Sequence, residues 1–436
     1  MRAFRFAGTT IVFAGLMAST APAYAQDTAA QAQSIQTEID QLKKDFDARL
    51  ADLEMRLAAL AGTPPPPPVV AEPVTPTQTV TPAPGQTTPA TPPEAALPAY
   101  NPTAGGKVFN PDMAVIGNFL GATGKNEVNP LPALQLSESE VSLQAIVDPY
   151  ARADFFLSFG EEGVAVEEGF ITFPTLPGGI LAKVGKMRAA FGKVNTLHDH
   201  VLPWTDRPIV IDNLVGGDDG IDDAGMSVSR LIPNPWFFFE GTAQVYRGDS
   251  EDVFHSAKRG DLSYVTHLRG YQDLSESTNI DLGVSWARGH NPSGIPLDGG
   301  PEVAGRFITN LYGFDGTIRW KPLQRAIYHS FIARTEYIVS RRDQPDGLQN
   351  SSGWYVSGDY QFARRWFAGV RFDRSDLLTD ARLHDSGGSL VLTYWPSEFS
   401  QVRGQFRRTN YAEGPAATEF LFQFQFAIGA HGAHPF

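Results

Sequence analysis

The last part of the chain alternates between large apolar residues and other residues. In the stretch from Glu419 to Phe436, an aromatic or aliphatic side chain occupies every second position from 420 to 428, at Phe420, Phe422, Phe424, Phe426 and Ile428. Alternation with a period of two predicts a β-strand whose two faces differ. A strand with phenyl rings along one face would aggregate in water, so we expect that face to contact lipid. The pattern therefore favours an outer-membrane β-barrel.

The first 25 residues have the features of a secretory signal peptide. Arg2 and Arg5 precede an apolar run from Thr9 to Met17, and Ala23-Tyr24-Ala25 supplies a small-x-small cleavage site. We therefore expect residues 1–25 to be removed on export.

Composition narrows the class of protein further. No later segment offers the roughly 18 apolar residues that a membrane-spanning helix needs, and the mean hydropathy is -0.20. Only a closed barrel could then span lipid. The chain has no cysteine, so strand pairing and packing must stabilise it without disulfides. The net charge of -13 argues against a nucleic-acid partner.

Residues 34–61 show the repeat of an amphipathic helix. Apolar side chains recur at steps of three and four, at Ile35, Ile39, Leu42, Phe46, Leu50, Leu53, Leu57 and Leu60. This seam predicts a trimeric or dimeric coiled coil with one stutter, because a single helix of this length is marginal in water. A lone helix on the rim of a barrel is the alternative. The proline-rich residues 62–106 cannot bury a core, and we expect a disordered or extended linker.

Residues 107–436 consist of short alternating segments separated by turn residues. Ile280, Leu282, Val284 and Trp286, for example, alternate with Asp281, Gly283 and Ser285. The count predicts an all-β, antiparallel barrel of about sixteen strands, within two. Side chains cannot fill a barrel of this width, so we expect an aqueous channel. A soluble β-sandwich would also alternate, but it fits so long a run of amphipathic strands less well.

The longest interruption of this alternation runs from Met187 to Asp223. It contains seven aspartates against Arg188, Lys193 and Arg207. Long loops in compact domains are usually functional, and in a wide barrel such a loop can fold inward and narrow the lumen. The sequence therefore predicts a cation-leaning or weakly selective constriction that includes Asp218, Asp219, Asp222 and Asp223. A solvent-exposed extracellular loop is the alternative.

Two histidines in this stretch suggest a metal site. His198 and His200 flank Asp199, and imidazole and carboxylate groups are common zinc ligands. The spacing fixes no third ligand.

Charged residues on the polar face of the strands are predicted to point into the channel. The candidates for lining the pore are Arg152, Asp154, Lys183, Arg371, Arg403 and Arg407. By the same alternation, the polar face of the strands also includes Glu138, Glu140, Glu168, Arg334 and Glu336. Opposed signs would create a transverse field, whereas pairs such as Arg334 with Glu336 could be purely structural. No GxSxG, HExxH or GxxxxGKS motif is present, so we expect neither an enzyme nor a cofactor.

The chain from Phe109 onward resembles the phosphate-selective porin O and P family and its porin-like relatives. The resemblance rests on the signal, the coiled coil with its linker, the segment from Val184 to Asn195 with the following His198 and His200, and the strand entry at Gly220 to Leu231. It implies a sixteen-stranded, trimeric diffusion channel. The aspartate-rich stretch departs from the arginine and lysine rows of that family's anion path.

Similar sequences that end as residues 429–436 do are sometimes labelled zinc-regulated TonB-dependent outer membrane receptors. A TonB-dependent transporter has a plug domain inside a twenty-two-stranded barrel. Here a coiled coil and a proline-rich spacer precede the barrel instead, which argues against that mechanism.

These observations together predict a porin in the outer membrane of a Gram-negative-type bacterium. Small hydrophilic solutes or ions would diffuse passively through a homotrimer surrounded by outer-membrane lipid, with the coiled coil in the periplasm. Two alternatives stay open: a structural anchor that contacts the cell wall through the coiled coil, and a zinc-related uptake receptor.

Overall fold

The structure is a computed structural model that describes residues 111–429, with gaps at 161–162, 218, 251–252 and 294–305, together with Gln41 and Lys44. The chain divides into two units, Met1–Ala99 and Tyr100–Phe436. In the first unit Gln41 and Lys44 are helical. The predicted signal peptide, the rest of the predicted coiled coil, the linker and Asp218 lie outside the described residues. Within the described ranges, no helix has the length and hydropathy needed to cross a bilayer.

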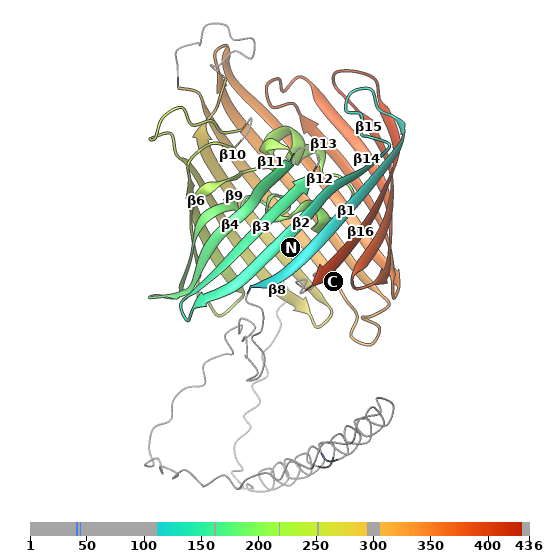
Figure 1. Cartoon of the computed structure of the whole chain (residues 1–436). Coiled ribbons are helices and arrows are strands. Elements are labelled where there is room, and N and C mark those ends of the chain that lie inside the picture. The colour runs from blue at the N-terminus through green and yellow to red at the C-terminus, as the bar shows by residue number, and fades with distance from the viewer. Residues whose placement is uncertain are drawn as a thin grey trace, which may run out of the picture. The chain divides into compact units, whose positions relative to one another are not determined.

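The second unit is a closed barrel of sixteen antiparallel strands (Figure 1), which confirms the predicted fold class. Each strand pairs with the next along the chain, and β1 closes the barrel against β16, where Phe119 lies opposite Phe424. The strands are β1 (Asp112–Lys125), β2 (Leu134–Asp148), β3 (Ala151–Gly160), β4 (Gly163–Leu176), β5 (Ile180–Arg188), β6 (Asp222–Leu231), β7 (Phe238–Tyr246), β8 (Ser263–Ser275), β9 (Thr278–His290), β10 (Ile308–Trp320), β11 (Ser330–Gln344), β12 (Gly347–Ala363), β13 (Trp366–Asp376), β14 (His384–Ser397), β15 (Ser400–Asn410) and β16 (Ala417–Gly429).

The two faces of the wall differ as the sequence predicts. In β16 the apolar positions Phe420, Phe422, Phe424, Phe426 and Ile428 are exposed on the outside of the barrel, whereas Leu421, Gln423 and Gln425 are buried on the inside. The same holds in β9, where Leu282 and Val284 are exposed and Asp281 and Ser285 are buried. The outer surface is therefore apolar, and the polar groups of the strands face inward.

The connections at the two ends of the barrel differ in length. At the end where β1 begins and β16 finishes, several strands are joined by tight turns at 149–150, 276–277, 364–365 and 398–399. At the opposite end lie the long connections 189–221, 247–262 and 291–307.

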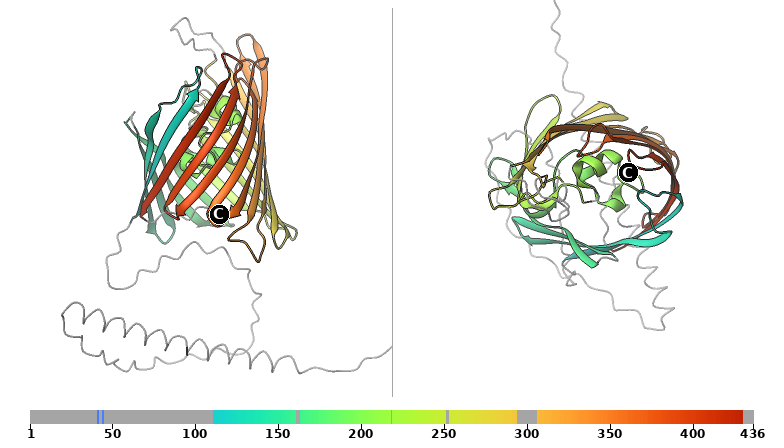
Figure 2. Two further views of the ribbon diagram at one scale, coloured as in Figure 1. Left: turned by 90° about the vertical axis from the view of Figure 1, so that its right-hand side faces the viewer. Right: turned by 90° about the horizontal axis from the view of Figure 1, so that it is seen from above.

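Residues 189–221, called here the inserted segment, join β5 to β6 and fold into the barrel. Seen from above, their short helices lie inside the ring of strands (Figure 2). The helices are η1 (Val194–Thr196), η2 (Asp199–Val201), α2 (Ile209–Ile211) and η3 (Asp212–Gly216).

The inserted segment gives the barrel an apolar core. Its side chains Phe191, Trp204, Val210, Ile211 and Leu214 are almost fully buried. They form one cluster with apolar side chains that the wall turns inward, namely Tyr246, Val265, Ala287, Leu311, Ile338 and Tyr355. The inner face is thus not lined by water throughout, which differs from the sequence-based expectation, because the inserted segment brings apolar surface of its own into contact with that wall.

Candidate functional site

The inserted segment is closed at its base by one buried asparagine. The Nδ2 group of Asn195 donates to the carbonyl oxygens of Ala189 and Ile221 at 2.9 and 3.1 Å, and its Oδ1 accepts from the Ile221 amide at 2.9 Å. The Ala189 amide also donates to the Ile221 carbonyl at 2.8 Å. The two ends of a long loop are therefore held together, which reduces the number of conformations available to the residues between them.

The first turn of the segment docks on β11 through a buried carboxylate. Oε1 of Glu336 accepts from the amides of Lys193 and Val194 at 3.2 and 2.8 Å. Gly192 precedes these amides with φ +61°, and a Cβ placed on it would lie about 2.1 Å from Glu336 Oε2. A glycine is favoured here because its φ is positive and because any Cβ would force the buried Glu336 carboxylate to move. Glu336 thus binds the segment, and the partner of Arg334 is Asp359 rather than Glu336.

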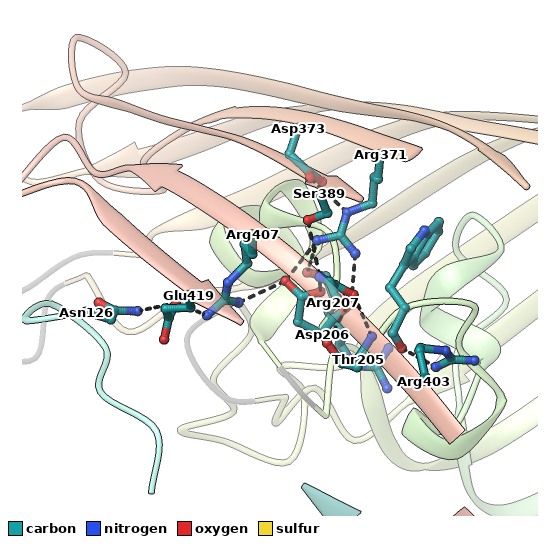
Figure 3. A network of polar contacts seen from close by, with 12 residues as sticks. Asn126, Thr205, Asp206, Arg207, Arg371, Asp373, Ser389, Arg403, Arg407 and Glu419 are labelled. Atoms are coloured by element: carbon teal, nitrogen blue, oxygen red, sulfur yellow. Dashed lines mark hydrogen bonds and ion pairs between the residues drawn. The ribbon is translucent and has the colours of Figure 1, made fainter. Parts of the chain in front are cut away.

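The middle of the segment docks on β13 and β15 through Asp206 (Figure 3). Its Oδ2 accepts from Arg371 Nη2 and from Arg407 Nη1, both at 2.9 Å. Arg371 also donates through Nη1 to the Asp206 carbonyl at 3.0 Å and through Nε to Asp373 at 2.8 Å. Arg407 continues the network to Glu419 of β16 at 2.6 Å. Two arginines of the wall therefore neutralise one aspartate of the segment.

These arginines shift the pKa of Asp206. Burial favours the neutral acid, but the charges of Arg371 and Arg407, together with hydrogen bonds from Arg371 and Gln405, outweigh it and lower the pKa to about 2. The carboxylate is therefore ionised throughout the physiological range.

Trp204 packs next to the Asp206 network, against β12 and β13. Its indole lies under the Arg371 guanidinium, 4.8 Å from ring centroid to Cζ, and meets the Tyr355 ring edge-on at 5.3 Å. Arg403 of β15 donates through Nη1 to the Trp204 carbonyl at 2.8 Å and to Gln423 at 2.7 Å. Cation–π and edge-to-face contacts of this kind add to the apolar burial of the ring.

Three basic side chains surround one carboxylate on the neighbouring wall. Asp281 of β9 is fully buried and lies 2.8 Å from Lys193 Nζ, 2.8 Å from Arg269 Nη2 and 3.9 Å from Arg319 Nη1. The side chains of Arg269 and Arg319 are 39% and 41% exposed. This group, called here the Asp281 cluster, carries more positive than negative charge, and it is reachable by solvent.

A second cluster combines histidine with glutamate. Nδ1 of His198 lies 2.9 Å from Glu140 Oε2 of β2 and 2.8 Å from Glu167 Oε2 of β4, and its Nε2 lies 2.9 Å from Glu168 Oε2. Nδ1 of His200 lies 3.5 Å from the same Glu140 oxygen. Burial opposes a charge on His198, but the three carboxylates outweigh it and raise the imidazole pKa to about 11.

A β-bulge explains why two successive glutamates contact one imidazole. Phe156 of β3 pairs with Glu168 and Leu157 pairs with Val166, so Glu167 is the extra residue of β4. A bulge redirects a side chain that strict alternation would place on the opposite face. Glu167 and Glu168 therefore both reach His198, whose ring also lies 5.1 Å from that of Phe156.

The remaining predicted residues are distributed along the wall and the base of the segment. Arg188 donates to the Asp219 carbonyl, Asp222 pairs with Lys186, and Arg152 pairs with Asp154 and Gln144. Lys183 lies over the Phe170 ring. Arg207 is buried, donates to the carbonyls of Val194 and Leu197, and pairs with Asp199. Asp222 and Asp223 begin β6 rather than ending the loop.

Asp223 has a structural environment. It is buried and accepts from the backbone amides of Ala224, Gly248 and Asp249 at 2.7, 2.7 and 2.8 Å. Three such hydrogen bonds occupy its oxygens, so this carboxylate fixes the turn after β7.

Sequence reasoning missed the roles of Glu167 and Asp206. Phase along the strand predicts Glu140 and Glu168 on the inner face but cannot anticipate a bulge at Glu167. Asp206 pairs with Arg371 and Arg407, which are 165 and 201 residues away along the chain. A pattern of neighbouring residues cannot predict contacts between residues so far apart in the sequence.

Comparison with known proteins gives the following relatives. No family model matches the chain. It is 30% identical over 350 residues to an uncharacterized protein of Aquifex aeolicus, covering 72% of this chain and 73% of that one. Solved structures with a similar fold include an OmpT loop-deletion mutant, an outer membrane protein of Vibrio cholerae, with 10% identity, a TM-score of 0.50, and 73% and 99% of the two chains covered.

Two further structures share the fold at 10% identity. OprB of Pseudomonas putida has a TM-score of 0.51 over 73% of this chain and 94% of its own. An anion-selective porin from Comamonas acidovorans has a TM-score of 0.50 over 73% of this chain and 99% of its own. The fold is thus that of outer-membrane porins.

Proposed function

The chain belongs to the same family as the uncharacterized Aquifex aeolicus protein, and we propose that it is an outer-membrane channel through which small hydrophilic solutes diffuse passively. One observation carries this proposal: a closed sixteen-stranded barrel exposes apolar side chains outward and turns its charged side chains inward. In water such a surface would aggregate, whereas in a bilayer it is stable because all backbone groups of a closed barrel are paired.

The lengths of the connections support an orientation. Barrels of this type have short periplasmic turns and longer extracellular loops. The end with the tight turns at 149–150, 276–277, 364–365 and 398–399 is then periplasmic. β1 begins at this end, so residues 1–110 are joined to the barrel on the periplasmic side. That topology supports a coiled coil in the periplasm. Together with the family resemblance it also supports a trimer, which the mass of the detergent-solubilised complex, measured by light scattering, would test.

The inserted segment is the constriction of the proposed channel. It lies inside the ring of strands (Figure 2) and is fixed to β11, β13 and β15 through Glu336, Arg371, Arg403 and Arg407. On the other side it contacts β2 and β4 through His198. A rigid insert narrows the lumen to the space between it and the wall, so we expect a small conductance and a low size limit.

The partly exposed basic side chains of the Asp281 cluster favour anions. Asp206 and Asp223 are committed to internal contacts, whereas Arg269 and Arg319 of the Asp281 cluster are partly exposed. Fixed charges in a narrow pore set its ion preference. We therefore expect anions to pass more readily than cations, the opposite of what the aspartate count alone predicts.

Planar-bilayer recording of the full chain tests both the channel and its preference for anions. We expect discrete conductance steps and a reversal potential on the anion-selective side under a salt gradient. Arg269→Gln and Arg319→Gln should each shift this potential toward cations. Arg382→Gln is the matched control, because Arg382 is 90% exposed in the 377–383 connection and pairs only with its neighbour Asp380 among the described contacts.

The outcomes separate the two statements. Folded protein that inserts into the bilayer and passes no current refutes the channel. A cation-selective current that the arginine variants leave unchanged refutes the anion preference and leaves the channel standing.

A further inference from the structure

From the geometry around His198 we propose a binding site for a divalent transition-metal ion of the Zn²⁺ class, formed by Glu140, Glu167 and His198 and completed by His200. The site joins the inserted segment to β2 and β4. It is independent of the proposed transport function, because its test reads metal binding rather than conductance.

The donor atoms converge on one point. One oxygen each of Glu140 and Glu167 and one ring nitrogen of His198 all lie within 4.8 Å of one another. Ligands of tetrahedral zinc, at about 2.0–2.2 Å from the ion, are separated by about 3.3–3.5 Å. The distances of 2.8 and 2.9 Å between Nδ1 of His198 and the two carboxylates therefore need to lengthen by only a fraction of an ångström.

The hydrogen bonding of these atoms is incomplete without an ion. Nδ1 of His198 lies 2.9 Å from Glu140 Oε2 and 2.8 Å from Glu167 Oε2, and the Glu140 side chain is only 2% exposed. A single Nδ1 proton could serve one of the two carboxylates that approach it, not both. A cation bound at the Nδ1 lone pair would satisfy both oxygens at once, which is how buried carboxylates are usually compensated.

The far side of the imidazole has the arrangement that metal-binding histidines usually show. His198 Nε2 lies 2.9 Å from Glu168 Oε2. When an ion displaces the Nδ1 proton, the ring keeps its Nε2 proton, donates it to Glu168 and presents the Nδ1 lone pair to the ion between Glu140 and Glu167. A carboxylate that accepts the second ring N–H orients the imidazole and increases its basicity toward a metal. The bulge that places Glu167 and Glu168 side by side supplies both a ligand and this partner.

The donor set determines the class of ion. Two imidazoles and two carboxylates suit Zn²⁺ and other divalent first-row transition metals, whereas Ca²⁺ and Mg²⁺ prefer oxygen ligands alone. The excess of carboxylates around His198 also favours a doubly charged ligand. Since His198 precedes η2, His200 lies within it, and Glu140 and Glu167 lie on the wall, a bound ion would cross-link the inserted segment to two strands.

The test is metal titration of the full chain, purified without a histidine tag and stripped with a chelator. Isothermal titration calorimetry should show one saturable Zn²⁺ site and no comparable Mg²⁺ site. Co²⁺ should give a visible absorption band from the same site. His198→Ala and Glu140→Gln should each abolish this site, and Glu168→Gln should weaken it by about 10- to 100-fold through the orientation of the ring.

Two controls keep the result specific. His329→Ala removes a histidine that stacks on Tyr360 away from the cluster, and the double variant His431→Ala/His434→Ala removes the other histidine pair of the sequence. Both should bind Zn²⁺ as the parent does. Heat-modifiable electrophoretic mobility checks that every variant is a folded barrel, and His198→Gln is available if the alanine variant fails this check.

Three results would overturn the proposal. The first is a folded parent protein with no saturable Zn²⁺ site. The second is unchanged affinity in folded His198 and Glu140 variants. The third is loss of binding only in the His431/His434 variant, which would place the ion at the end of the chain.

Discussion

Arg371 of β13 holds Asp206 of the inserted segment by two contacts at once: Nη2 donates to Oδ2 at 2.9 Å and Nη1 donates to the backbone carbonyl at 3.0 Å. The Arg371 side chain is 1% exposed and that of Asp206 is 16% exposed. The pair therefore fixes both the position and the direction of the segment relative to the wall, and it can be tested directly.

Asp206→Asn should destabilise the barrel. The variant leaves the buried Arg371 and the adjacent Arg407 without their shared counter-charge, and we expect a loss of about 2–4 kcal/mol in the free energy of unfolding. Urea titration in lipid vesicles measures it. Glu127→Gln is the control, because Glu127 and its partner Lys125 are 55% and 77% exposed, so that removing this pair should leave the free energy of unfolding almost unchanged. Equal losses in both variants would contradict the role of Asp206.

The same carboxylate predicts a pH dependence. The pKa of Asp206 is lowered to about 2 in the folded protein. Its contribution, on the order of 2 kcal/mol, is therefore complete above the ordinary aspartate pKa and is lost as the pH falls from about 5 toward 2. The stability difference between the parent protein and Asp206→Asn isolates this effect, and it should shrink over that range. A difference that stays constant from pH 6 to pH 2.5 would be inconsistent with a depressed pKa.

Gly192→Ala should detach the first turn of the inserted segment from β11. The new Cβ would meet the Glu336 carboxylate, in a backbone conformation that already disfavours a side chain. We expect a loss of about 2–4 kcal/mol from overpacking and backbone strain together. Gly179→Ala is the matched control, since Gly179 has a similar positive φ, +70°, but nothing lies within 4 Å of the added atom. It should lose only about 1 kcal/mol. Both values come from urea titration, and a similar loss in the two variants would argue against the contact with Glu336.

Phe424→Arg should show that the aromatic row of β16 faces hydrocarbon. An arginine near the midplane of a bilayer costs about 2–4 kcal/mol, and the cost falls to about 0–1 kcal/mol at the interface. Phe399→Arg is the interfacial control, because Phe399 is exposed in the turn at 398–399. Unfolding free energies in phospholipid vesicles compare the two. If Phe424→Arg is tolerated as well as Phe399→Arg, the outer face of β16 does not contact the membrane interior.

The barrel itself was predictable because its signal is local and repeated. Phe420 to Ile428 alone distinguish two faces, and the spacing of such segments leads to sixteen strands. Each strand obeys the same two-residue period, so errors at single positions do not change the architecture.

The interior was less predictable because it depends on contacts between distant residues. The seven aspartates of the 187–223 stretch indicate negative charge. Whether a solute meets that charge depends on partners such as Arg371, and the sequence around the aspartates does not predict which distant residues pair with them. Likewise the histidine pair was visible in the sequence, whereas Glu167 becomes its neighbour only through a bulge in β4. The coiled coil and the linker lie outside the described residues and stay predictions.

The seam between β1 and β16 joins residues that are the farthest apart in the barrel, as Ala114 lies opposite Gly429. Until both strands are present, each has an edge whose amides and carbonyls would be left unpaired in hydrocarbon. Closure of this barrel in a membrane therefore has to wait for the last strand of the chain. A chain that ends before β16 would leave the edge of β1 unpaired, and we expect it to aggregate or be degraded rather than to form a narrower pore.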